Sequence, residues 1–239
     1  SQCSDYLAQG TAYAYDYPYK AVHYWDEGWA FYAGSAQEVG STSTSDMAYE
    51  LAEKRCTDFG TCGAAGTSSD STDRPSLVNR NLLYLYNLGL EQLAAAQCIA
   101  AATTKDNIVS QMTIPLIQGT LKYVYKSDPV GYASWGTAAD DEKANAEGWA
   151  FAAALLPFVD ACDSTVSQTL YDNINMGLGT AGMVPDGYVA VKTAIESTYA
   201  CLGITCADVG AYGSWSACSD GSTAATVFNS DSTAAPTAT

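Results

Sequence analysis

Basic residues are scarce in this chain of 239 residues, which has 10 Lys and Arg against 26 Asp and Glu. The formal net charge is −16, and the sequence pI is about 4.1. Binding to nucleic acid requires a basic face that neutralises phosphates, so this charge argues against nucleic acid as a partner. It also disfavours an anionic membrane surface and favours the recruitment of cations.

Several signatures of enzymes are missing as well. The chain has a single histidine, His23, and no Gly-x-Ser-x-Gly motif, which disfavours a Ser-His-Asp hydrolase. It also lacks a Gly-rich phosphate loop, a calcium-binding loop and the Cys-x-x-Cys pairs of zinc sites. A metal-dependent oxidase built in a helical bundle would need Glu-x-x-His pairs, which do not occur. We therefore predict that the protein is not an enzyme.

No apolar run approaches the ~18 residues of a membrane-spanning helix. The start Ser1-Gln2-Cys3 is interpreted as a mature terminus left by signal-peptide cleavage. Eight cysteines in so acidic a chain predict a secreted or cell-surface protein in which all eight are paired. The short spacings Cys56 to Cys62 and Cys201 to Cys206 suggest two local bridges, although spacing alone leaves the connectivity open.

Residues typical of strands are few, and alanine is abundant, which favours helices. We predict an all-α protein whose helices cover about residues 4–15, 20–37, 45–56, 75–102, 106–126, 138–163, 164–176 and 188–201.

An internal repeat is the most informative feature of the sequence. The pentapeptide Glu27-Gly28-Trp29-Ala30-Phe31 recurs 120 residues later as Glu147-Gly148-Trp149-Ala150-Phe151. The triplet at 9–11, Gln-Gly-Thr, recurs at 118–120. Each triplet is followed by two tyrosines, Tyr13 and Tyr15 in the first case and Tyr123 and Tyr125 in the second. Cys98 and Cys218 share the offset of 120.

The repeat predicts two tandem, pseudo-symmetric helical-bundle halves, stabilised by disulfides, at residues 1–105 and 106–218. Residues 219–239 are rich in Ser and Thr and cannot bury enough apolar surface to fold alone. We predict that they form a spacer, with O-glycosylation as one use, leading to a further extracellular module or to a cell wall. The segment Trp215–Ser219 resembles the start of a thrombospondin type 1 module.

Positions three and four apart share a helix face, which places Lys20, His23 and Glu27 together. The equivalent positions of the second copy hold Asp140, Lys143 and Glu147. If the halves pack about a pseudo-twofold axis, the two glutamates meet between them. Carboxylates with one imidazole and phenols form a ligand set suited to Fe³⁺. The candidate metal ligands are Glu27, Glu147, His23, Tyr13 and Tyr123.

Structural explanations of the same residues stand beside this hypothesis. Trp29, Phe31, Trp149 and Phe151 are predicted core residues, and the two mid-helix glycines are predicted to allow close helix approach. Each glutamate could accept a hydrogen bond from a Trp indole N–H or from a helix end. His23 could be a hydrogen-bonded core histidine.

The duplicated Glu-Gly-Trp-Ala-Phe segments, in an acidic, cysteine-containing chain, resemble the algal periplasmic iron-assimilation proteins, which are related to the phytotransferrins. The resemblance covers about residues 4–206 and is most specific over His23–Tyr32. It implies iron acquisition at the cell surface with Fe³⁺ as ligand, and only Glu27 and Glu147 inherit that expectation directly. The second copy lacks the histidine and has Ala152 in place of Tyr32, which favours one site over two equal ones.

Two function classes follow. The first is a cell-surface or periplasmic ferric-iron binding protein, in which carbonate could serve as a second, synergistic ligand. Such an anion requires a cationic donor, for which Lys20 and Arg80 are candidates. The second class is a structural or adhesive surface protein that uses the same helical fold without metal, a hypothesis to which the Ser/Thr-rich tail and the thrombospondin-like fragment contribute.

Overall fold

The computed structural model describes residues 3, 17–34, 47–63, 75–128, 138–179, 183–213 and 215–228. Within these ranges the chain is helical, with one isolated antiparallel bridge between Cys62 and Ser76 and no β-strand. The predicted all-α fold class is therefore confirmed. None of the helices in these ranges combines the length and the hydropathy that crossing a lipid bilayer requires.

The chain divides into two compact units. Unit 1 comprises residues 1–54, 62–111 and 227–239, and unit 2 comprises residues 55–61 and 112–226. Two of the boundaries, after residues 54 and 111, fall inside continuous helices, α3 (Ala48–Phe59) and α5 (Cys98–Ser127). The predicted boundary after residue 105 also lies inside α5, so no linker marks it. The pseudo-symmetric relation of the halves stays a prediction.

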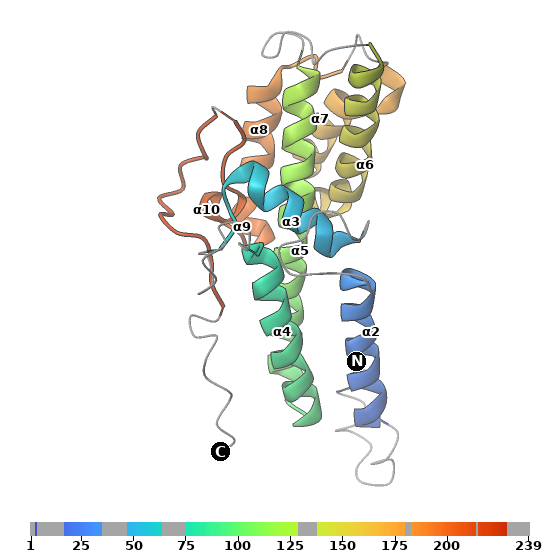
Figure 1. Cartoon of the computed structure of the whole chain (residues 1–239), viewed down its shortest axis with the longest axis vertical. Helices are drawn as coiled ribbons and strands as arrows, with labels where there is room; N and C mark the ends of the chain where they lie inside the picture. Colours follow the sequence, from blue (N-terminus) through green and yellow to red (C-terminus); the bar gives the residue numbers. More distant parts are fainter. Residues whose placement is uncertain are drawn as a thin grey trace. The chain divides into compact units, whose positions relative to one another are not determined.

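In unit 1, α2 (Tyr17–Ala33) packs against α4 (Leu77–Ala94) (Figure 1). The side chain of Ser76 caps α4 by accepting a hydrogen bond from the backbone N–H of Asn79. The buried face of α4 has apolar residues at helical spacing, at positions 78, 82, 85 and 93. Gly89 completes this face, because a side chain there would overlap the ring of Trp25 on α2.

The helix predicted over residues 75–102 is two helices. α4 ends at Ala94, and α5 begins at Cys98. Between them Ala96 has a φ of 56°, in the left-handed region that is unfavourable for alanine. No glycine or proline lies at the break, so the alanine-rich sequence predicts an uninterrupted helix there.

In unit 2, the second part of α5 is followed by α6 (Ala138–Cys162) and α7 (Ser164–Ile174), which pack against each other (Figure 1). Asp163 joins them and caps α7, its Oδ1 accepting from the N–H groups of Thr165 and Val166. The 3-10 turn η2 and three short helices complete the unit: Met176–Leu178 (η2), Tyr188–Glu196 (α8), Tyr199–Leu202 (α9) and Cys206–Val209 (α10).

All eight cysteines are disulfide-bonded, as predicted. Three bridges are Cys3–Cys98 in unit 1 and Cys162–Cys201 and Cys206–Cys218 in unit 2, and Cys56 and Cys62 are bonded as well. The suggested local bridge between Cys201 and Cys206 is wrong. Gly203 lies between the two cysteines with a φ of 71° and ends α9, so the cysteines lie on different helices.

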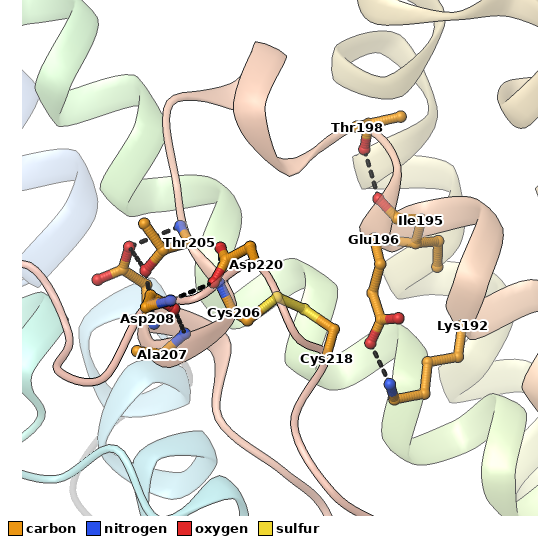
Figure 2. The surroundings of a disulfide bond; sticks show 11 residues. Lys192, Ile195, Glu196, Thr198, Thr205, Cys206, Ala207, Asp208, Cys218 and Asp220 are labelled. Atoms are coloured by element: carbon orange, nitrogen blue, oxygen red, sulfur yellow. Dashed lines mark hydrogen bonds and ion pairs between the residues drawn. A yellow bond between two sulfur atoms is a disulfide. The ribbon is translucent and has the colours of Figure 1, made fainter.

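The Cys206–Cys218 bridge ties the following segment to α10 (Figure 2). Asp220 accepts a hydrogen bond from the Cys206 N–H at 2.9 Å, and Asp208 Oδ2 accepts one from the Thr226 hydroxyl at 3.1 Å. Hydrogen bonds from Ser222 and from the Cys206 backbone lower the pKa of Asp220 to about 2. Residues 219–226 thus belong to unit 2, and the role of the C-terminal residues as a spacer stays a prediction. Residues 229–239 lie outside the described part of the chain.

Candidate functional site

The first copy of the repeated pentapeptide presents a histidine–carboxylate pair on α2. His23 and Glu27 are one helical turn apart, so their side chains share a face. His23 Nε2 lies 3.2 Å from Glu27 Oε1, and the two side chains are 56% and 47% exposed. This exposure corrects the idea of a core histidine. Both side chains are therefore partly accessible to solvent.

Aromatic side chains fix the opposite face of α2. The indole N–H of Trp25 donates to the carbonyl of Tyr86 on α4 at 2.8 Å, and the two rings meet edge to face. Trp29 makes the same edge-to-face contact with the rings of Tyr86 and Tyr49. These contacts hold the orientation of α2, so His23 and Glu27 stand on a rigid element.

A buried polar network continues from the end of α2. The hydroxyl of Tyr32 donates to Asn79 Oδ1 at 2.6 Å, and the Asn79 amide donates to Glu53 Oε1 at 2.7 Å. The N–H of Ser76 donates to the other oxygen of Glu53 at 2.9 Å. Burial raises the pKa of Glu53 and raises the pKa of Tyr32 well above its ordinary value. The network joins α2, α3 and α4 within unit 1.

The second copy of the pentapeptide, on α6, has a different environment. Glu147 faces Lys143 at 3.7 Å, and its side chain is 35% exposed. Phe151 stacks on Tyr123 of α5 with a ring-centroid separation of 5.8 Å and an interplanar angle of 7°. Gly119 lies under Phe151, and Gly148 lies against Tyr123 and Ile174. Here the glutamate has a cation as its neighbour and the aromatic residue is packed.

Unit 2 also holds a group of basic side chains that the sequence analysis missed. Arg55 is 7% exposed and Lys126 is 8% exposed. Asp58 Oδ2 lies 3.1 Å from Arg55 Nη2 and 2.8 Å from Lys122 Nζ. Burial lowers the pKa of Arg55, and burial together with the charge of Lys122 lowers the pKa of Lys126 to about 8. Only the fold brings these residues together, because Arg55 lies far from the lysines in sequence.

The predicted ligands are thus divided between the units. His23 and Glu27 lie together in unit 1, whereas Glu147 and the buried Tyr123 lie in unit 2. Tyr13 lies outside the described residues, and so does the side chain of Lys20 on α2. Within the described ranges no three His, Cys, Asp or Glu side chains are grouped as metal ligands. The joint site of Glu27, Glu147 and His23 stays a prediction.

Arg80, the other candidate anion donor, is exposed on α4. With Asn81, Leu83, Tyr84 and others it lines an open depression of about 330 Å³ in unit 1. Its Nη1 also approaches Gly63, where a side chain would collide with it. Nothing else in the depression points to an anion, since its other lining residues are neutral.

The aromatic residues of the pentapeptides, all predicted to lie in the core, differ in burial. Trp29, Trp149 and Phe151 are partly buried, but Phe31 is 80% exposed, so its assignment to the core is wrong. Gly148 permits close helix approach, as predicted. A side chain at Gly28, in contrast, would meet Tyr86 only at an ordinary 3.5 Å.

The sequence comparison gives one result over nearly the whole chain. A family model described as "low iron-inducible periplasmic protein" matches residues 5–227. No curated protein and no solved structure matches the chain.

Proposed function

The chain belongs to the family of low iron-inducible periplasmic proteins, and from this premise we propose that it binds ferric iron as cargo for iron acquisition. Its localisation is periplasmic, and its role is related to iron, as the family description states. The binding of Fe³⁺ itself is the step that goes beyond the family.

The exposed His23–Glu27 pair is the observation that carries the proposal. Two ligands at about 2.1 Å from one ion, at a right angle, lie about 3 Å apart, as in octahedral sites. The observed 3.2 Å between His23 Nε2 and Glu27 Oε1 fits this separation. An imidazole nitrogen and a carboxylate oxygen are both accepted ligands of iron. The pair could therefore occupy two neighbouring positions around one ferric ion.

Charge supports the same assignment. The net charge of −16 attracts cations over the surface of the whole chain. Exposure lets the ion enter without the desolvation of a buried carboxylate. The pair supplies two ligands, and the remaining positions would be filled by water, by a bound anion or by Tyr13, which remains a predicted ligand.

The second copy is a poor iron ligand by the same criteria. Lys143 stands where the first copy has His23, and its ammonium group is a donor without a lone pair for a metal. Glu147 Oε1 also lies 3.7 Å from Lys143 Nζ, so this carboxylate already has a cation beside it. We therefore assign a single iron site, to the first copy.

The test is a calorimetric titration of the full chain with Fe³⁺ supplied as a weak chelate, with and without bicarbonate. Glu27→Gln keeps the shape of the side chain and removes its charge, and Glu147→Gln is the matched control. We expect one ion per chain for the parent and for E147Q, and at least tenfold weaker binding for E27Q. Equal binding by E27Q and the parent would refute the iron role of Glu27, and no binding by the parent would favour a structural or adhesive role.

A further inference from the structure

The basic side chains of unit 2 surround an arginine that has unused hydrogen-bond donors. Arg55 Nη2 contacts Asp58 Oδ2, but Arg55 Nε and Nη1 are buried and have no hydrogen-bond partner in the described structure. Buried polar atoms are partnered in the large majority of native structures, so each exception requires an explanation. Arginine keeps its charge at any physiological pH, so it cannot escape by releasing a proton.

Arg55 and Lys122 share one carboxylate. The same oxygen of Asp58, Oδ2, lies 3.1 Å from Arg55 Nη2 and 2.8 Å from Lys122 Nζ. A single carboxylate oxygen therefore contacts two cations, in a chain whose overall charge is strongly negative.

Aromatic rings cover the two lysines on α5. Lys122 Nζ lies 5.8 Å from the ring centroid of Tyr212, and Lys126 Nζ lies 5.5 Å from that of Tyr123. Such cation–π contacts hold an ammonium group in place without neutralising it. The cations are therefore kept positioned in a partly desolvated environment, where attraction for an anion is stronger than in water.

We propose that unit 2 contains a binding site for a small oxyanion, centred on Arg55 with Lys122 and Lys126 beside it. The ligand class is a small oxyanion of the size of hydrogen phosphate or sulfate. Its oxygens would accept from Arg55 Nε or Nη1, which have no hydrogen-bond partner in the described structure, and its negative charge would pair with Arg55 and Lys122, which share Asp58. The site does not depend on the iron site, since its residues lie on α3 and α5 within unit 2 and include neither His23 nor Glu27.

The test uses the full, iron-free chain in chloride buffer at constant ionic strength. Inorganic phosphate is titrated in calorimetry and followed by the line width of its ³¹P resonance, with sulfate and bicarbonate as separate arms. We expect one binding event per chain for at least one of these anions. Arg55→Lys keeps the charge but loses the spare donors, and we expect it to bind at least tenfold more weakly.

Lys105→Gln is the matched control, because the Lys105 side chain is 58% exposed and belongs to unit 1. K105Q should bind the anion as the parent does. If R55K fails to fold by circular dichroism, Lys122→Gln replaces it, with a loss of affinity again expected. The proposal is overturned if the parent binds none of the three anions, if R55K or its replacement binds as tightly as the parent, or if K105Q abolishes binding.

Discussion

The two copies of the pentapeptide have the same five residues and opposite environments. On α6, Phe151 stacks on Tyr123. A Cβ atom at Gly148 would lie only 3.0 Å from Tyr123 Cβ. On α2, Phe31 is 80% exposed and Gly28 has room for a methyl group. Identical local sequence therefore does not fix burial, which depends on what the neighbouring helices place against the segment.

The residue one helical turn before the glutamate also differs between the two copies. The first glutamate has His23 as its partner one turn earlier, and the second has Lys143. An imidazole can share a metal ion with a carboxylate, whereas an ammonium group can only pair with it. Under the proposed function, the exposed copy would bind iron and the packed copy would serve helix packing.

The largest expected difference in stability is between the two phenylalanines. Phe151→Ala removes the stacked ring over Gly119 and should lower the free energy of unfolding by about 3 kcal/mol. Phe31→Ala removes an exposed ring and should change it by no more than about 0.5 kcal/mol. Denaturant unfolding of the two variants under identical conditions measures the difference. Similar losses for both would show that Phe31 is packed in solution.

The two glycines give the next largest contrast. Gly148→Ala places a methyl group 2.8 Å from Ile174 Cδ1 and should destabilise the protein by about 1–3 kcal/mol. Gly28→Ala meets only the Tyr86 ring at 3.5 Å and should stabilise α2 by up to ~1 kcal/mol, because alanine is the better helix former. Opposite signs in thermal unfolding are expected. A destabilised G28A would mean that another segment covers Gly28.

Tyr32 and Ala152 occupy equivalent positions after the two pentapeptides, and only Tyr32 has a buried hydroxyl. Tyr32→Phe keeps the ring but leaves Asn79 Oδ1 without its donor, which should cost about 1–2 kcal/mol. Ala152→Ser is the matched change in the second copy and adds a hydroxyl at a fully buried position. Circular dichroism melts would contradict the network if Y32F unfolded at the same temperature as the parent.

The smallest expected effect is a pH dependence from Glu53 beneath the first copy. Its pKa is raised above 4.5 by burial, against the hydrogen bonds from Asn79 and Ser76, so the folded state holds the proton more tightly than the unfolded state. This contribution to stability is complete below pH 4.5 and is lost as the pH rises through the folded-state pKa. The parent should therefore lose stability relative to Glu53→Gln between pH 4 and pH 7. A constant difference in melting temperature over that range would contradict the shift.

Much of the fold could be predicted from the sequence because the signals were local. Alanine-rich segments and the lack of strand patterns identified the helices, and the even cysteine count predicted full pairing. The break at Ala96 and the Cys162–Cys201 bridge were missed, since the first has no glycine or proline and the second joins residues 39 positions apart.

Helix periodicity predicted only the part of the candidate site that lies on one helix. The spacing of His23 and Glu27 placed them on one face, and they are 3.2 Å apart. The basic group around Arg55 could not be predicted, because its members come from α3 and from α5, more than 60 residues later. Burial of charge is a tertiary property that no local pattern records.

The central claim is that the first copy binds the iron. It can be tested at a single residue, because His23 is the only histidine in the chain. Its imidazole ring therefore gives a single set of proton NMR signals, and Ga³⁺ can replace Fe³⁺ without paramagnetic broadening. We predict that Ga³⁺ shifts these signals in the parent and in E147Q, but not in E27Q. Binding of Ga³⁺ that leaves the His23 signals of the parent unmoved would contradict the claim.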